Sequence, residues 1–236
     1  MSVNDPAVAF DHFSHTYEDG TRALDDVSFS VAAGESVGLI GHNGSGKSTL
    51  FMHIVGILGP DPRVTVEGLP VTRANLPAVR RAVGYVFQNP RDQLFMSKVV
   101  EDVAFGPLNA GMTPHEALHA AEHALEKVGL AGFEERVPYH LSGGEMRRAS
   151  IATVLATSPR IIVMDEPSSG LDPRATRDLI TLVRSLGGTK LISSHDLDFI
   201  RACTDRVILL NRGRMVADGP APDILDNRDF LVENGL

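Results

Sequence analysis

One glycine-rich stretch constrains the fold of this chain more than any other feature: Gly41–Thr49, with the sequence GHNGSGKST. It follows the apolar run ESVGLI, precedes a predicted helix from Lys47 to about Leu58, and fits the pattern G-x-x-x-x-G-K-[ST]. Glycines allow the backbone N–H groups to point inward, and the helix N-terminus adds partial positive charge. A plain glycine-rich turn is the alternative, but a complete motif between a strand and a helix favours a phosphate-binding loop.

The residue types within this loop predict how a phosphate group would be held. Lys47 can reach the β and γ phosphates of a nucleotide, and the Ser48 hydroxyl suits a bound Mg²⁺ ion. The predicted nucleotide contacts in the loop are Gly41, His42, Asn43, Gly44, Ser45, Gly46, Lys47, Ser48 and Thr49.

Two acidic residues follow a second apolar run, in RIIVMDEP from Arg160 to Pro167. The apolar residues predict a buried strand that carries Asp165 to its carboxyl end, the edge at which open α/β sheets bind ligands. There Asp165 could hold Mg²⁺ through water, and Glu166 could polarise an attacking water molecule. Solvated acids at a strand end are the alternative, which the glycine-rich loop disfavours.

A second turn of small residues opens another predicted helix, in LSGGEMRR from Leu141 to Arg148. Free backbone N–H groups at a helix N-terminus form an anion site. Alone, this turn would indicate no more than an ordinary helix start. Beside the two other motifs, it indicates a second contact with phosphate.

The rest of the chain alternates strand-like and helix-like segments, which predicts a single α/β domain of residues 1–236. Strand patterns occupy residues 1–87 and 159–219, which we expect to form the nucleotide-binding core. Residues 88–158 lose these patterns and predict an inserted helical segment, and residues 220–236 form a tail that is helical in part. A length of 236 residues, 43% of them hydrophobic, suffices for a large domain with an insertion.

Charge and composition narrow the classes of partner. The formal net charge of −8 argues against nucleic acid, because binding a polyphosphate needs a positive surface. The one cysteine, Cys203, excludes an intrachain disulfide and is expected to be a small buried hydrophobe. We find neither a signal-peptide pattern nor an apolar run of the ~18–20 residues that a membrane crossing needs, so any membrane role should be peripheral.

The motifs and their order resemble the nucleotide-binding subunits of ABC transporters over nearly the whole chain. This resemblance implies a P-loop (RecA-like) core with an N-terminal antiparallel β subdomain and an inserted α-helical subdomain, and it implies hydrolysis of ATP with Mg²⁺. It further implies that Tyr17 stacks on adenine, that Gln88 contacts Mg²⁺ and the attacking water, and that His195 contacts the γ-phosphate. The implied catalytic residues are Glu166, His195 and Gln88, and the implied Mg²⁺ contacts are Ser48, Gln88 and Asp165.

The same resemblance implies a second copy of the chain as a partner. The LSGGE turn would grip the γ-phosphate of ATP bound to that copy, and the loop SSGLD would run along the dimer interface. Since one chain holds half of each site, two copies facing head to tail would enclose two ATP molecules about a twofold axis. The family usually has Gln where this chain has Glu145, a change that keeps an acceptor and adds negative charge. The residues concerned are Ser142, Gly143, Gly144 and Glu145, and Ser169, Gly170, Leu171 and Asp172.

The segment FQNPRDQLFMSKVVEDVAFGPLNAGM, Phe87 to Met112, is similar to the ATPase subunits of energy-coupling-factor importers, which take up cobalt, nickel or vitamins. That similarity implies a peripheral subunit on the cytoplasmic face of the cell (inner) membrane. Its partners would be an energy-coupling transmembrane protein and a substrate-binding membrane protein. We expect exposed apolar groups at Leu94, Phe95 and Met96, with packing inside the helical segment as the alternative. The predicted contacts with the membrane partner are Asp92, Gln93, Leu94 and Phe95.

The cargo and the class of ATPase keep alternatives at this point. A divalent metal, cobalt or nickel, is favoured because the short chain, without a long C-terminal extension, looks similar to the metal-dedicated ATPases. Biotin or another vitamin is the alternative. A soluble ABC ATPase such as an iron–sulfur assembly factor is a further alternative. A P-loop kinase or GTPase is disfavoured, because it would have no use for the LSGGE turn or for His195.

A row of histidines recurs every four residues in the predicted helix PHEALHAAEHALEKVGL, at His115, His119 and His123. Such spacing places imidazoles on one helix face, where two could chelate a divalent metal. The three glutamates in the same stretch favour a solvated surface instead. His12 and His15 are likewise expected to be solvent-facing strand residues.

Overall fold

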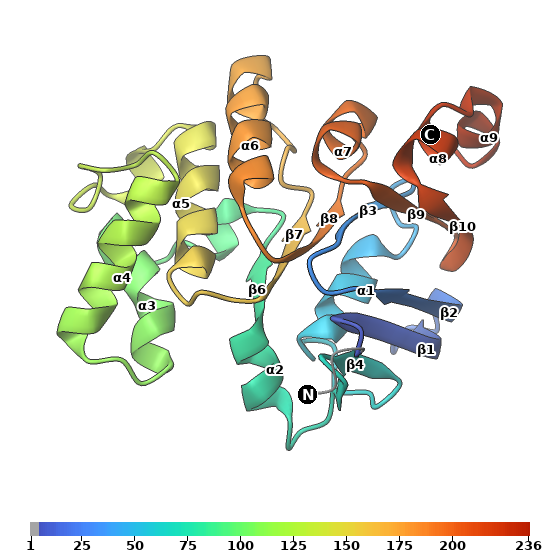
Figure 1. Ribbon diagram of the computed structural model, residues 1–236, viewed down its shortest axis with the longest axis horizontal. Helices are drawn as coiled ribbons and strands as arrows, with labels where there is room; N and C mark the ends of the chain where they lie inside the picture. Colours follow the sequence, from blue (N-terminus) through green and yellow to red (C-terminus); the bar gives the residue numbers. More distant parts are fainter. Residues whose placement is uncertain (1–4) are drawn as a thin grey trace.

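The computed structural model describes residues 5–236, and its strands form two sheets (Figure 1). The smaller sheet is antiparallel, has the strand order β2-β1-β4-β5, and comes from the N-terminal part of the chain. The elements are β1 (Val8–Thr16), β2 (Arg22–Val31), β4 (Val64–Val66) and β5 (Leu69–Pro70).

The larger sheet has six strands in the order β10-β9-β3-β8-β7-β6, and all of its pairings are parallel except that of the edge strand β10. Parallel neighbours require crossover connections, and helices supply most of them. Together the two sheets confirm the predicted mixed α/β class. The strands are β3 (Ser36–Ile40), β6 (Val83–Val86), β7 (Ile161–Asp165), β8 (Thr189–Ser193), β9 (Arg206–Asn211) and β10 (Arg214–Pro220).

Strand β7 shows why the central strands are apolar at nearly every position. Successive side chains of a strand point to opposite faces of the sheet. Ile161 and Val163 join a buried cluster with α1 and the small sheet, whereas Ile162 and Met164 join a second buried cluster with the helices on the other face. Because both faces are covered, the sequence of β7 is a continuous apolar run rather than an alternating one.

Three helices make up most of residues 88–158, and these residues, all of which the structure describes, contain no strand. They lie at one end of the molecule, coloured green to yellow in Figure 1. The middle helix begins and ends at residue types that favour these positions: Thr113 caps it, Pro114 is its first residue, and Gly129 follows its end with φ 69°. The helices are α3 (Val99–Asn109), α4 (Pro114–Lys127) and α5 (Gly143–Leu155), with 3₁₀ turns at Pro90–Asp92 and Pro138–His140.

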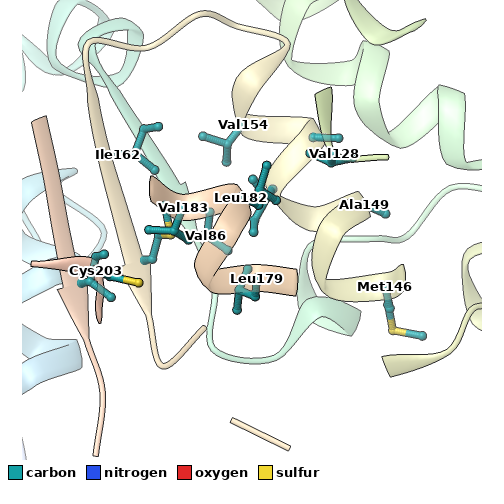
Figure 2. Close-up of a cluster of buried hydrophobic side chains, with 14 of the residues drawn as sticks. Val86, Val128, Met146, Ala149, Val154, Ile162, Leu179, Leu182, Val183 and Cys203 are labelled. Atoms are coloured by element: carbon teal, nitrogen blue, oxygen red, sulfur yellow. The ribbon is translucent and has the colours of Figure 1, made fainter. Parts of the chain in front are cut away.

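The helical segment shares its apolar core with the large sheet rather than having a separate one. Figure 2 shows Met146 and Ala149 of α5 beside Leu179 and Leu182 of α6 (Pro173–Ser185), with Ile162 of β7 in the same cluster. Through this shared packing, α5 contacts β6, the edge strand of the large sheet.

Several short elements depart from the sequence-based predictions. The first helix ends at Ile54 rather than near Leu58, and two seven-residue helices were not predicted.

Cys203 is buried, as expected. Within residues 5–236, no helix has the length and apolar character that a membrane crossing requires. The remaining helices are α1 (Lys47–Ile54), α2 (Leu76–Ala82), α7 (Leu197–Cys203), α8 (Ala221–Leu225) and α9 (Arg228–Glu233).

Candidate nucleotide site

A hollow of about 440 Å³ lies where the N-terminus of α1 meets the carboxyl ends of the parallel strands. The structure brings four separately predicted features to this one place: an N-terminal tyrosine, the glycine-rich loop, the glutamine after β6 and the glutamate after β7. The lining residues are Tyr17, Thr21, Arg22, Ala23, Asn43, Gly44, Gly46, Lys47, Ser48, Thr49, Gln88 and Glu166.

The N-terminus of α1 is open toward this hollow. Its N-cap is Gly46 with φ 108°, and among the described residues no side chain caps it. A Cβ at Gly46 would lie 2.6 Å from the carbonyl oxygen of Ala23, so only glycine fits this close approach. The Lys47 ammonium group curls back over the loop and donates to the Gly41 carbonyl at 2.7 Å and to the His42 carbonyl at 3.3 Å. Unpaired N–H groups and a cation therefore face the same space, as an anion site requires.

Tyr17 stands at the rim of the hollow on the loop after β1. Its hydroxyl lies 2.8 Å from the Thr49 hydroxyl, which ties the tyrosine to the first turn of α1. The Tyr17 side chain is otherwise part-exposed, at 38%, and the His15 ring packs edge-on against it at 4.8 Å. One ring face is thus free to stack on a flat ligand next to the loop.

Asp165 is held rigidly at the end of β7. It is 2% exposed, and the Ser193 hydroxyl donates to it at 2.6 Å while the Tyr85 hydroxyl donates at 3.3 Å. Burial, followed by the charge of Asp165, raises the pKa of Tyr85 well above its ordinary value, so the phenol stays a donor. Sequence reasoning did not identify Tyr85 or Ser193 as supports, because nothing in the local pattern shows that β6 and β8 flank β7.

Glu166 occupies a left-handed backbone conformation, φ 46°, which is unusual for a residue other than glycine. Such strain occurs mainly at functional sites. The carboxylate is 5% exposed and is held between two nitrogen groups: the His195 Nδ1 atom at 2.7 Å and the Lys47 Nζ atom at 3.7 Å. The structure therefore brings Glu166, His195 and Lys47 close together. A buried carboxylate in this position can accept a proton from a water molecule.

The LSGGE turn lies apart from this hollow. It borders a second one, of about 220 Å³, together with the loop Ser169–Leu171 and the residues just after Gln88. The two sets of lining residues have no described member in common. One chain therefore presents two separate sets of polar backbone groups, not a single closed site.

The LSGGE turn also differs from the glycine-rich loop in that a side chain caps the helix that follows it. Ser142 caps α5 and its hydroxyl donates to the Glu145 carboxylate at 2.7 Å, while the Ser142 backbone N–H donates to the same carboxylate at 2.8 Å. This capping box lowers the pKa of Glu145, first through the Ser142 hydroxyl. Asp172 similarly caps α6, accepting from the N–H groups of Arg174 and Ala175. Gly143 and Gly144 lie in the first turn of α5.

The stretch after Gln88 departs in part from the sequence-based prediction. Leu94 is 1% exposed and belongs to the core, so the prediction that it is exposed was wrong. The physical reason is that a 3₁₀ turn at Pro90–Asp92 directs the chain inward against α5. Gln93 also bonds inward, donating to the Ser150 carbonyl at 2.8 Å. Phe95 is 55% exposed, as predicted, and its ring packs edge-on against Phe105 at 5.2 Å.

The histidines outside the hollow behave largely as surface groups. His115, His119 and His123 are exposed, and residues 5–236 contain no group of three or more His, Cys, Asp or Glu side chains that could hold a metal. His12 is exposed and pairs with Asp26, as expected for a solvent-facing residue. The same prediction for His15 was wrong, because its ring packs against the buried His53 ring at 4.6 Å.

The chain is similar in sequence to known ABC transporter proteins. A family model described as "ABC transporter" matches residues 24–169. The energy-coupling factor transporter ATP-binding protein EcfA of Methanothermobacter thermautotrophicus is 45% identical over 229 residues, which cover 94% of this chain and 74% of EcfA.

Two solved structures show the same fold over nearly the whole chain. The first is cbiO1 of Clostridium perfringens, described as part of the ABC transporter complex cbiONQ. It has a TM-score of 0.85 and 31% identity, and the match covers 98% of this chain and 94% of cbiO1. The second is the ATP-binding cassette MJ0796, in a dimeric post-hydrolysis state bound to ADP and Pi. It has a TM-score of 0.81 and 28% identity, and the match covers 91% of this chain and 98% of MJ0796.

Proposed function

The chain belongs to the ABC transporter family and is an ATP-binding, ATP-hydrolysing subunit, and from this premise we propose that it powers an importer of the energy-coupling-factor type. One observation carries the ATPase part: the hollow that gathers Tyr17, the glycine-rich loop, Gln88 and Glu166. The importer type is supported by the similarity to EcfA and to cbiO1 of the cbiONQ complex.

ATP would lie along the hollow with adenine against Tyr17 and its phosphates at the N-terminus of α1. The loop N–H groups and Lys47 would bind the phosphate oxygens. Asp165, Ser48 and Gln88 offer carboxylate, hydroxyl and amide oxygens, a donor set that fits Mg²⁺, so these residues would hold the ion. Bound there, Mg²⁺ would neutralise charge on the phosphates.

Glu166 would act as the proton acceptor in hydrolysis. A water molecule attacks the γ-phosphorus, its proton passes to the Glu166 carboxylate, and the bond from the γ-phosphorus to the bridging oxygen breaks, leaving ADP. His195 holds the carboxylate at 2.7 Å and so fixes its orientation. Lys47 stabilises the charge that develops on the phosphate oxygens.

Two copies would be needed to complete each site. The separation of the P-loop hollow from the LSGGE turn supports this, as does the dimeric state of the related cassette MJ0796. In a head-to-tail pair the turn of one copy, Ser142 to Glu145, would meet the γ-phosphate bound by the other. The loop Ser169–Asp172 would lie at the interface. Hydrolysis then adds charge and releases the pair.

We further propose that the pair binds integral membrane subunits at the cytoplasmic face of the membrane. Phe95 and Phe105 form an exposed aromatic pair at the surface of the helical segment, and Asp92, three residues before Phe95 in the sequence, is also exposed. Leu94 and Gln93 would act from inside by holding that surface in place. The cargo we propose is a divalent metal, cobalt or nickel, which is supported by the likeness to cbiO1; biotin or another vitamin is the alternative.

The dimer is tested with Glu166→Gln, which keeps the shape of the side chain and removes the proton acceptor. We expect this variant to bind ATP, to hydrolyse it slowly and to elute as a dimer when sized by light scattering with ATP and Mg²⁺. A Lys47→Ala, Glu166→Gln double variant is the matched control and should stay monomeric. A strictly monomeric Glu166→Gln protein at saturating ATP would refute the head-to-tail dimer.

The membrane role is tested by co-expression with candidate membrane subunits encoded nearby. Phe95→Ala and Asp92→Arg should reduce co-purification while leaving ATP binding intact. Val232→Ala, which truncates another exposed apolar side chain far along the chain, is the control. Unchanged co-purification of both test variants would remove this surface from the proposal. Uptake of labelled cobalt, nickel and biotin by the intact complex then decides the cargo.

A further inference from the structure

Arg147 is an arginine buried inside the helical segment. It lies on α5, is 2% exposed and is the largest fully buried side chain of the described chain. It belongs to none of the ion pairs among the described residues, although the charge of Asp165 favours its charged form without direct contact. Burial of a cation without an ionic partner is costly, so such a residue persists only where other contacts hold it.

Two backbone carbonyls bind the guanidinium group. The Nη1 atom donates to the Phe87 carbonyl at 2.8 Å, and the Nη2 atom donates to the Gln88 carbonyl at 2.7 Å. Burial lowers the pKa of Arg147 to about 10, so the group is still charged at neutral pH and both bonds are charge-assisted. Arg147 thus donates a hydrogen bond to the backbone of Gln88, a residue that lines the candidate nucleotide hollow.

A second tie holds the far end of the same loop. The Gln93 amide donates to the Ser150 carbonyl at 2.8 Å and to the Thr153 hydroxyl at 2.6 Å, and its oxygen accepts from the Phe87 N–H at 3.1 Å. Both ends of the loop 87–93 are therefore hydrogen-bonded to α5. Gln88 cannot shift far unless α5 shifts with it.

The other end of α5 is the Ser142 turn. Arg147 follows Ser142 by five residues, which in an α-helix is a rise of roughly 7.5 Å. We propose that Arg147 is a positioning residue that makes the Gln88 loop and the Ser142 turn move as one piece. ATP bound by this chain then sets the position of the turn that meets ATP on the second copy. This inference rests on the proposed head-to-tail dimer.

A purely structural role would give a different result. If Arg147 only filled space, an apolar side chain of similar length would serve as well. If it positions the loop, loss of the donors should separate two properties. ATP binding to the monomer depends on the P-loop and should persist, whereas ATP-driven pairing depends on the placement of Ser142 and should weaken.

The test compares Arg147→Met and Arg147→Lys in the wild-type and Glu166→Gln backgrounds. Methionine keeps the apolar stem and removes every donor, while lysine keeps the charge but cannot present two parallel N–H groups. Arg184→Met, at an exposed arginine on the neighbouring helix α6, is the matched control. Fluorescent ATP binding, light scattering at increasing ATP, steady-state ATPase and thermal unfolding are measured for each.

We expect ATP affinity of the Arg147→Met monomer within about twofold of the parent, with the ATP concentration for half-maximal pairing raised, and kcat lowered, by about tenfold. Arg147→Lys should fall between. Pairing of Arg147→Met at the parental ATP concentration would overturn the inference, and if that variant does not fold, parental pairing by Arg147→Lys would overturn it. A Glu166→Gln parent that never pairs removes the dimer itself, so the two failures are distinguishable.

Discussion

Helices α1 and α5 both begin at a turn of small residues. Among the described residues, a side chain caps the N-terminus of α5, whereas no side chain caps that of α1. Helix α1 starts at Gly46, with no side-chain cap from the described residues and no acid in its first turn. Helix α5 starts at Ser142, whose capping box with Glu145 already satisfies part of the turn. A small-residue turn is therefore an open anion site only where the chain leaves the helix N–H groups unpaired.

The interiors of the two helices differ as well. His53, in the last turn of α1, is 4% exposed and makes no hydrogen bond through its ring within the described chain. Burial, followed by the nearby charge of His15, lowers its pKa to about 4, so it is neutral at pH 7. Arg147 of α5 is equally buried but charged and bonded to the Gln88 loop. The first helix is packed as a fixed support, whereas the second is linked to a loop at the nucleotide.

The largest expected effect comes from removing the cation at the N-terminus of α1, with Lys47→Ala. Lysine is the cation of the nucleotide hollow that reaches the loop carbonyls, and its loss removes charge where the phosphates should lie. We expect ATPase activity to fall by about a hundredfold or more, measured by phosphate release. Lys47→Arg is the control for charge alone. Wild-type rates in Lys47→Ala would show that α1 is not the phosphate site.

The corresponding change in α5, Ser142→Ala, should be smaller and different in kind. The alanine variant loses the cap hydroxyl but leaves the P-loop hollow untouched. Monomer affinity for ATP should stay the same while kcat falls about tenfold, with helix stability reduced by about 1 kcal/mol. Ser142→Thr keeps the hydroxyl and should restore most of both. Weaker ATP binding by the Ser142→Ala monomer would mean that both helix ends serve one site.

The two helices also show which features could be predicted from the sequence: local motifs could, whereas contacts between distant residues could not. Gly41–Thr49, Asp165 and Glu166 could be proposed as site residues from the sequence, because phosphate and metal chemistry requires those residue types in contiguous, ordered patterns. Leu94 was misplaced because exposure in the helical segment depends on which face α5 covers, a long-range fact. The tie from Arg147 to the Phe87 carbonyl joins residues 60 apart in sequence, and no local pattern encodes it.

The short elements were missed for a related reason. Helices α2 and α7 span seven residues each, too few turns to display a helical period. His15 was expected in solvent because strand alternation alone gives no sign that His53 would pack against it from α1.

The variant His53→Leu, at a buried residue of α1, should change the stability of the fold only at acid pH. The pKa of His53 is 6.5 in the unfolded chain and about 4 when folded, so its neutral form is favoured by folding. Stability from this group is complete above pH 6.5 and declines as the pH falls toward 4, by at most about 3 kcal/mol. Leucine cannot titrate, so the urea unfolding free energy of the variant should fall less steeply over that range. Its absolute stability at pH 7 serves as the packing control, and equal slopes for both proteins would contradict a neutral buried imidazole.

The smallest effect should come from removing the negative charge at the N-terminus of α5 with Glu145→Gln. The amide oxygen can still accept from the Ser142 N–H, so the cap survives, but the negative charge beside the turn is gone. That charge is present at neutral pH, and the Ser142 hydroxyl, followed by the Ser142 N–H, lowers the pKa of Glu145 further below its ordinary value. An anionic phosphate approaching Ser142 must overcome it, and a charge at a helix terminus is worth about 0.3–1 kcal/mol. In the Glu166→Gln background we therefore expect pairing at about threefold lower ATP, measured by light scattering. Glu145→Ala is the control that removes both the charge and the two bonds that the carboxylate accepts from Ser142. A higher ATP requirement for Glu145→Gln would mean that the carboxylate assists the contact with the second copy, and that the closed helix end is the working form.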